Sequence, residues 1–168
     1  MKSPICDICL KSGILCPGCQ EKVTKGEISE LEVDISLKLY NLLQKYKMPQ
    51  ELTFHKAIET DDTVVLVVGE NQIGTIVGKG GKVVKSLQKD LEKKIRVIEN
   101  TDDIKKIAQD LIHPARIAGV NILYLPGGGK KKKLRIPVED EKKLPIDTSI
   151  VEDIILRMAG ESVDVVIE

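Results

Sequence analysis

The sequence has few aromatic residues and no net charge. Its 168 residues include no Trp, one Phe and three Tyr. This scarcity argues against folds that read RNA by stacking bases on a sheet of aromatic side chains. The 26 basic residues balance 26 acidic ones. Net charge therefore favours no class of partner, and the positions of the lysines become the informative feature.

Long apolar runs are also missing. No run reaches the roughly 18 residues that a membrane-spanning helix needs. Residues 1–20 lack the basic start and the apolar stretch of a secretion signal. We therefore expect a cytoplasmic protein, and the apolar share of 42% is sufficient for one domain or two small ones.

All four cysteines lie within residues 1–24. Cys6 and Cys9 form one C-x-x-C motif, and Cys16 and Cys19 form a second. Two tight turns that each deliver a pair of thiolates suit tetrahedral Zn²⁺, and a segment too short for an apolar core would depend on the metal. We predict a structural zinc knuckle. The first alternative is a pair of disulfides, which a reducing compartment disfavours. The second is a redox C-x-x-C pair, which is disfavoured because no strand precedes it.

The residues after the knuckle predict an α+β fold. Thr24-Lys25-Gly26-Glu27 has the form of a capping box, so a long helix should follow, with an apolar stripe that starts at Ile28 and ends before Pro49. The pattern then predicts strands over 52–58 and 64–68, helices over 70–77 and 82–94, and a strand over 95–98. The order is αββααβ.

Three glycines and two lysines lie between two pairs of β-branched apolar residues in the stretch IVGKGGKVV, where the two consecutive helices meet. A turn between two helices needs one glycine, so this stretch offers more bare backbone and positive charge than such a turn requires. The element order, with Ile76, Val77, Gly78-Lys79-Gly80-Gly81 and Val84 in these places, resembles the type II KH domain. That resemblance implies a loop that clamps the backbone of about four unpaired nucleotides.

Bare glycine backbone and the N-terminus of a helix together suit a phosphate group. The residues that we expect to contact RNA are Ile73, Ile76, Val77, Gly78, Lys79, Gly80, Gly81, Lys82, Lys85 and Lys89. In this interpretation the lysines supply charge, and the three apolar side chains form a floor for bases. The alternative is a break between two helices with exposed lysines and no ligand. The glycine spacing fits neither a dinucleotide-binding loop nor a P-loop.

The remainder of the chain repeats the same order. It predicts a helix over 102–115, strands over 120–125 and 134–138, helices over 139–144 and 147–159, and a strand over 162–167. Glu51–Glu70 aligns with Val120–Glu139 at a constant offset of 69 residues, and the last strands keep that offset. We predict two tandem KH-type domains, 25–100 and 101–168. The second is degenerate, because Pro145-Ile146-Asp147-Thr148 replaces the glycine loop.

A run of lysines follows three glycines in the second copy. Lys130, Lys131, Lys132, Lys133 and Arg135 are expected at a mobile hairpin tip. Such a tip would be a secondary RNA contact with salt-dependent binding. The alternative is a solvated tip that aids solubility.

The tandem arrangement resembles the archaeal NusA-like transcription factors. This implies binding of single-stranded RNA in transcription elongation, termination or RNA processing. The alternative is a zinc-stabilised adaptor that docks on RNA polymerase, the ribosome or an RNA-processing complex, with RNA contact secondary. No nucleophile–base pair or open metal site is evident, so we expect a binding protein and no enzyme. We also expect a monomer.

Overall fold

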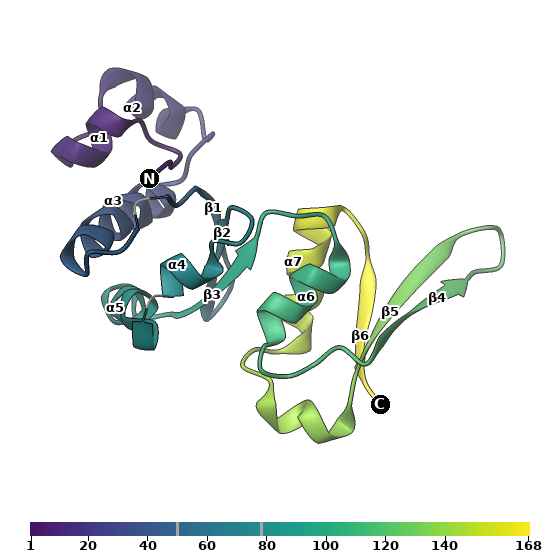
Figure 1. Ribbon diagram of the computed structural model, residues 1–168. Coiled ribbons are helices and arrows are strands. Elements are labelled where there is room, and N and C mark those ends of the chain that lie inside the picture. Colours follow the sequence, from purple (N-terminus) through teal and green to yellow (C-terminus); the bar gives the residue numbers. More distant parts are fainter. Residues whose placement is uncertain (50, 78) are drawn as a thin grey trace. The chain divides into compact units, whose positions relative to one another are not determined.

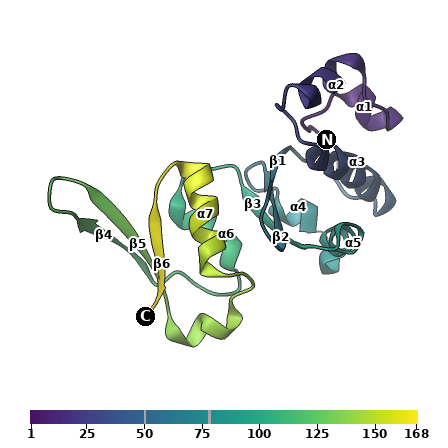
Figure 2. The same cartoon turned by 180° about the vertical axis from the view of Figure 1, so that it is seen from behind.

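The computed structural model describes residues 1–49, 51–77 and 79–168. The chain divides into two compact units, Met1–Asn100 and Thr101–Glu168, which are described separately. Each contains a mixed three-stranded sheet with helices beside it, so the fold is α+β, as predicted (Figures 1 and 2). Within the described residues, every helix is too short or too polar to cross a bilayer.

The first unit starts with two short helices before its sheet. Its elements are α1 (Asp7–Ser12), α2 (Pro17–Thr24), α3 (Glu30–Lys45), β1 (Phe54–Glu59), β2 (Thr63–Val68), α4 (Ile73–Val77), the 3₁₀ turn η1 (Lys79–Gly81), α5 (Lys82–Leu91) and β3 (Lys94–Glu99). Strand β1 pairs antiparallel with β2, and β2 pairs parallel with β3. Helix α5 ends earlier than predicted, because Glu92 adopts the left-handed conformation.

Helix α3 begins at a capping box different from the one that we predicted. Ser29 Oγ accepts a hydrogen bond from the N–H of Glu32, and Ser29 N–H donates to Glu32 Oε1, both at 3.0 Å. Ile28 and Val33, on either side of this box, join the same apolar cluster, as in a hydrophobic staple. The prediction at Thr24 was wrong because Thr24 ends α2 and donates its hydroxyl to the carbonyl of Gln20.

The core of the first unit lies between its helices and one face of the sheet. Helix α3 contributes Ile35, Leu39 and Leu43, all fully buried. The other buried members are Leu52, Phe54, Val64, Leu66, Val68, Ile76, Val83, Leu87, Ile95 and Val97. Helices α3, α4 and α5 therefore share one core with the sheet, and this core fixes where the glycine loop between α4 and α5 lies.

The second unit has the same strand order and the same strand directions. Its elements are α6 (Ile104–Ile112), β4 (Gly119–Tyr124), β5 (Lys130–Ile136), the 3₁₀ helix η2 (Val138–Lys143), α7 (Thr148–Ala159) and β6 (Val163–Ile167). Strand β4 pairs antiparallel with β5, and β5 pairs parallel with β6. Asp103 caps α6, and Gly160 ends α7 in the left-handed conformation.

The predicted offset of 69 residues holds for two strands of three. Val64 pairs with Ile95, and Lys133 pairs with Asp164 at the same offset. Val64 also pairs with Glu59, whereas Lys133 pairs with Asn121, so the first strands differ by 62 residues (121 minus 59). The constant offset was therefore wrong for the first strand. The second hairpin is longer, and it projects beyond the rest of its sheet in Figure 1.

Candidate nucleic-acid interface and metal centre

The loop before α5 places two successive glycines in the left-handed conformation. Gly80 has φ 67° and Gly81 has φ 69°, values that side-chain-bearing residues adopt at a cost. Gly81 is the N-cap of α5 and provides no side-chain hydrogen bond to the first turn. Gly78 lies outside the described residues, and the side chain of Lys79 is not described. The first turn of α5 is therefore left without a side-chain cap.

The glycines are not required by packing inside the protein. A Cβ built at Gly80 would meet nothing within 4 Å, and one at Gly81 would meet only Lys85 Cε at 3.8 Å. The backbone of these two residues is thus open to a group that approaches from outside. The N–H groups of the first turn and the positive end of the helix dipole make such a position favourable for an anion.

Three lysines follow the loop on one exposed side of α5. Lys82, Lys85 and Lys89 are all exposed, and their spacing of three and four residues places them on one helix face. Lys82 Nζ lies 5.8 Å from the ring centroid of Tyr46, and the Tyr46 hydroxyl lies 3.3 Å from Ser86 Oγ. Our sequence analysis covered Tyr46 only as part of the long helix that was predicted to end before Pro49. The structure shows that it joins the end of α3 to α5.

The three apolar residues beside the loop do not share one role. Ile76 is fully buried in the core of the first unit. Its expected place in a floor for bases was therefore wrong, because its side chain supports the loop from inside. Ile73 and Val77 are only partly buried and pack at the margin of that core. These two alone, of the three, retain apolar surface that a ligand can reach.

A second glycine contact, missed by our sequence analysis, holds the start of α4. Gln72 Oε1 accepts a hydrogen bond from the backbone N–H of Thr53 at 2.7 Å. The Gln72 side chain passes so close to Gly69 that a Cβ there would lie 2.6 Å from Gln72 Oε1. Glycine at position 69 is therefore needed for close approach. The contact ties the segment before α4 to the start of β1.

The corresponding helix of the second unit is capped by a carboxylate. Asp147 Oδ1 accepts hydrogen bonds from Ser149 N–H at 2.9 Å and from Ser149 Oγ at 3.0 Å. The backbone N–H of Ser149 is the main reason that the pKa of Asp147 is lowered. The α7 N-terminus thus carries its own anion, where the first unit has bare glycine backbone.

The run of lysines lies in a strand and not at a mobile tip. Lys131 Nζ is 3.1 Å from Asp164 Oδ2, and Lys132 Nζ is 2.9 Å from Glu161 Oε2. Lys133 pairs with Glu168, and Lys130 Nζ lies 5.6 Å from the ring centroid of Tyr124. The predicted mobile tip was wrong, because carboxylates in and beside β6 neutralise three of the four lysines.

Arg135 continues this strand and lies over a glycine. A Cβ at Gly119 would come within 2.6 Å of Arg135 Nη2. Gly119 therefore allows the guanidinium to pass across β4. Arg135 is held close to the sheet surface, which does not fit its expected place in a mobile basic tip.

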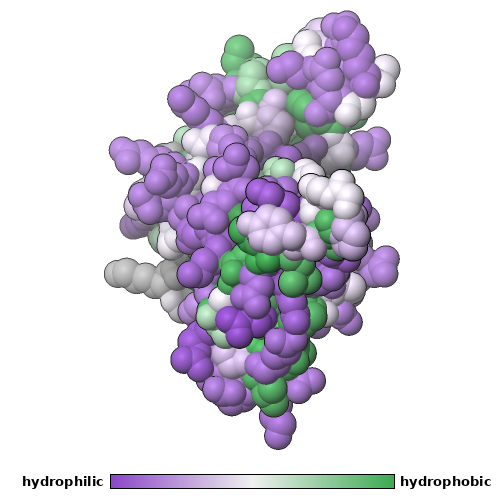
Figure 3. Space-filling model, turned by 90° about the vertical axis from the view of Figure 1, so that its right-hand side faces the viewer, coloured by the Kyte–Doolittle hydropathy of each residue, from purple (hydrophilic) through white to green (hydrophobic). Residues whose placement is uncertain are grey.

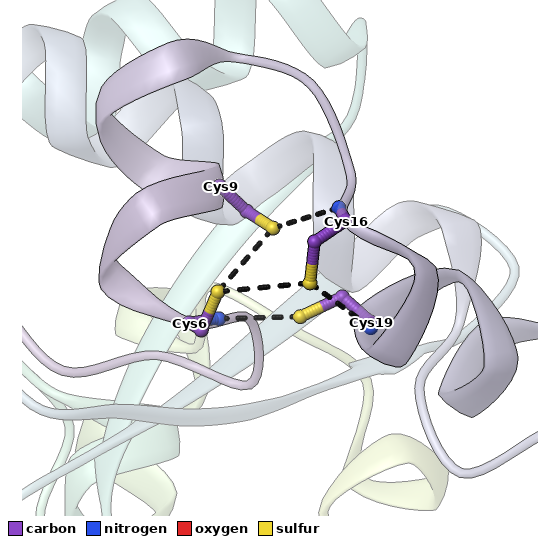
Figure 4. Close-up of side chains that lie close together, drawn as sticks. All are labelled: Cys6, Cys9, Cys16 and Cys19. Carbon is purple, nitrogen blue, oxygen red and sulfur yellow. Dashed lines mark hydrogen bonds between the residues drawn. The ribbon is translucent and has the colours of Figure 1, made fainter.

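The four cysteines converge at the starts of two helices (Figure 4). Cys6 is the N-cap of α1 and Cys16 is the N-cap of α2, so Cys9 and Cys19 fall in the first turns. All four sulfur atoms lie within 4.8 Å of one another, and none is in a disulfide. The Sγ atom of Cys6 is 3.4 Å from that of Cys9 and 3.9 Å from that of Cys16.

Backbone N–H groups point at these sulfur atoms. Cys16 N–H donates to Cys9 Sγ at 3.1 Å, and Cys6 N–H donates to Cys19 Sγ at 3.4 Å. The N–H of Cys19 lowers the pKa of Cys16 to about 7, while burial raises the pKa of Cys9 to about 12. Four thiolates at about 2.3 Å from a tetrahedral Zn²⁺ lie about 3.8 Å apart. The donor set and its spacing therefore fit such an ion.

The cysteine segment shares an apolar cluster with α3. Its buried members are Ile5, Cys9, Leu10, Cys19 and Ile28. Val33, Leu37 and Tyr40, on α3, pack against this cluster. We expected the metal alone to hold the segment together. That was wrong, because α3 provides an apolar surface that the segment itself is too short to build.

A KH domain model matches residues 45–122. This match covers a little under half of the chain and lies mainly in the first unit. The probable transcription termination protein NusA of Methanocaldococcus jannaschii is 33% identical over 60 residues, which are 36% of this chain and 33% of that one. The NusA of Methanococcus vannielii is 37% identical over 60 residues, 36% of this chain and 35% of that one. The matched part thus spans about a third of these relatives, and over that part the chain is similar to archaeal NusA.

The chain also resembles a solved structure over most of its length. The crystal structure of APE1850 has a TM-score of 0.55 and 20% identity, and covers 78% of this chain and 95% of that chain. At this identity the likeness shows the fold alone. The KH match includes the glycine loop and α5, and it excludes the four cysteines and most of the second unit.

Proposed function

We propose that this chain is a KH-domain protein and that it binds single-stranded RNA at Gly78–Gly81 and the first turn of α5. The observation that carries the proposal is the pair of left-handed glycines with open space above them, at a helix start without a side-chain cap. KH domains clamp unpaired nucleotides with such a loop. Phosphate groups would take the position that Asp147 occupies for α7.

The flanking residues divide the remaining tasks. Lys79, Lys82, Lys85 and Lys89 would supply charge along the strand of nucleotides. The side chains of Lys82, Lys85 and Lys89 are exposed, which suits that task. Ile73 and Val77 would contact the bases from beside the loop. Lys130, next to the exposed ring of Tyr124, is the secondary RNA contact that we still propose in the second unit.

Cys6, Cys9, Cys16 and Cys19 would hold a structural Zn²⁺. The ion would take no part in a reaction, because four thiolates leave no open coordination position. It would fix α1 and α2 at one geometry and so preserve the apolar cluster on α3. In this proposal the chain comprises a zinc knuckle (1–24), a type II KH domain (25–100) and a degenerate KH-like domain (101–168).

The similarity to archaeal NusA supports a place in transcription. The two relatives are named as probable transcription termination proteins. We propose that this cytoplasmic chain contacts transcripts during elongation, termination or processing, as a binding protein and not as an enzyme. RNA polymerase or the ribosome would then be its larger neighbours.

One observation favours a second role as an adaptor. Ile8 and Ile14, on the cysteine segment, are 73% and 75% exposed. Two large apolar side chains in water beside a metal-stabilised helix suit contact with a protein. In that role the segment would dock on RNA polymerase, the ribosome or an RNA-processing complex, and RNA contact would be secondary.

Fluorescence polarisation with a short unpaired oligonucleotide tests the RNA proposal. Replacing Lys79 and Gly80 by Asp should weaken binding by about tenfold or more, because carboxylates repel phosphates at close range. Gly160→Asp is the matched control, since Gly160 is also left-handed but ends α7. Equal affinity in the loop variant and the control would refute the proposal. If a cysteine variant alone lost a protein partner, the adaptor role would be supported.

A further inference from the structure

The edge of the first sheet is covered by the chain itself. Lys2 donates its N–H to the carbonyl of Leu52 and accepts from the N–H of Phe54, both at 2.8 Å. Glu32 Oε2 accepts the N–H of Ala57, in β1, at 3.0 Å. These contacts occupy backbone groups that an edge strand would otherwise offer to another chain.

The edge of the second sheet carries no such protection among the described contacts. Strand β4 pairs with β5 on one side only. Ile122, Leu123, Tyr124 and Leu125 are 48%, 45%, 74% and 46% exposed. No residue from Ile117 to Gly129 is charged. In Figure 3, where the hairpin points toward the viewer, hydrophobic surface gathers along it. Exposed edges usually carry charges that prevent pairing, and this edge has none.

The neighbouring strand gives little reason for an acidic partner. Lys131, Lys132 and Lys133 are already paired with Asp164, Glu161 and Glu168. The positive charge of β5 is therefore largely balanced within the same unit. A strand that adds to β4 would gain most from being apolar and uncharged, as β4 itself is.

We infer that β4 pairs antiparallel with β4 of a second copy of this chain. Two-fold symmetry makes such an interface self-complementary, because each strand offers the side chains that the other needs. Leu123 lies on one face of the strand, and Ile122 and Tyr124 lie on the other. Apolar cross-strand pairs therefore form on both faces, and two three-stranded sheets join into one of six strands. A dimer replaces the monomer expected from the sequence.

The hydrogen-bond pattern leaves the required groups free for this pairing. Leu125 donates its N–H to the carbonyl of Gly129 at 2.7 Å. Because antiparallel strands alternate, the backbone groups of Val120, Ile122 and Tyr124 then point away from β5. These groups lie at the open edge, and Ile122 is close to the middle of the strand.

Sedimentation velocity of the full chain over a range of concentrations tests the dimer. The wild-type chain should pass from monomer to dimer as its concentration rises. Ile122→Lys and Ile122→Glu should each remain monomeric, because like charges would meet near the two-fold axis. An equimolar mixture of the two variants should dimerise again, since opposite charges then face each other. Recovery on mixing also shows that neither variant has lost its fold.

Leu156→Lys is the matched control, since Leu156 is 50% exposed but lies on α7. It should dimerise as the wild-type chain does. A wild-type chain that is monomeric up to about 1 mM, where even weak complexes form, would overturn the inference. So would dimers that persist in both charge variants, or variants whose mixture stays monomeric.

Discussion

The two units share one sheet topology and differ at the two places where such a sheet can meet another molecule. In the first unit the loop before α5 is bare glycine, and Lys2 and Glu32 cover the edge of β1. In the second unit Asp147 caps α7, and no strand of the described residues pairs with the outer edge of β4. The shared sheet topology therefore does not determine what each unit binds. A few residues at a helix start and at a strand edge decide which surface is available.

The largest expected effect comes from removing the proposed Zn²⁺, which should alter the first unit alone. A structural Zn²⁺ in a small finger supplies about 10 kcal/mol or more. A strong chelator should therefore unfold α1 and α2 and expose the outer face of α3. Hydrogen exchange should accelerate in α1, α2 and α3 and stay unchanged in α7. Cys16→Ser should reproduce the effect without chelator, and exchange that is unchanged in α1 and α2 would contradict a metal-stabilised segment.

The next effect separates support of the glycine loop from contact with RNA. Ile76→Ala should lower the free energy of unfolding of the first unit by about 2–5 kcal/mol, because it opens a cavity in the core. Affinity for RNA should stay within a few-fold while the unit remains folded. Ile73→Ala, at a partly buried position, should change the free energy of unfolding little and should weaken RNA binding. Urea unfolding, followed through the NMR signals of β2, measures the stability of the first unit, and fluorescence polarisation measures RNA affinity. A large loss of RNA affinity in folded Ile76→Ala would restore its predicted contact role.

Local motifs allowed the main features to be predicted from sequence. The two C-x-x-C pairs and the GKGG stretch were found because metal and phosphate binding need fixed spacing of a few residue types. Strands β2, β3 and β6 followed from their apolar runs, and so did the last three residues of β5. Their common offset survives in the structure because the parallel pairs keep the same register in both units.

Features that depend on tertiary contacts were missed. Thr24–Glu27 and Ser29–Glu32 both have the form of a capping box, so the sequence does not show which one begins α3. The structure decides for Ser29, because α2 extends to Thr24. Consecutive lysines gave no strand signal, because their pairing with β6 is a long-range contact. Likewise, α3 buries residues on two sides, so a single stripe could not reveal that the cysteine segment packs against it.

A smaller, pH-dependent effect should distinguish the second unit. Asp140 is buried and accepts hydrogen bonds from Arg116 N–H at 2.9 Å and Arg116 Nε at 3.0 Å. This contact with Arg116 lowers the pKa of Asp140 below its ordinary value. The carboxylate therefore stabilises the folded unit above its unfolded pKa of about 4, and that stabilisation is lost as the pH falls through the lower folded pKa.

Thermal unfolding at pH 7 and pH 3 checks this expectation. The second unit should lose stability in acid, and Asp140→Asn should be less stable at pH 7 with a weaker dependence on pH. Asp153→Asn is a suitable control, since its ion pair with Arg157 is exposed. Equal pH profiles for the wild-type chain and Asp140→Asn would show that the Arg116 contact does not control acid stability.

The smallest effect concerns lysines that are already paired. Lys132→Ala removes a partly exposed ion pair with Glu161 and should change stability by about 0–1 kcal/mol. Its effect on RNA affinity should be negligible, because its charge is balanced within the unit. Lys82→Ala, beside the glycine loop, should instead make binding less dependent on salt. The slope of the logarithm of the binding constant against the logarithm of the salt concentration should fall in magnitude by about 0.7, which is the contribution of one phosphate contact on a single strand. Binding measured at several salt concentrations compares the two. A greater loss of slope in Lys132→Ala than in Lys82→Ala would move the RNA surface to the second unit.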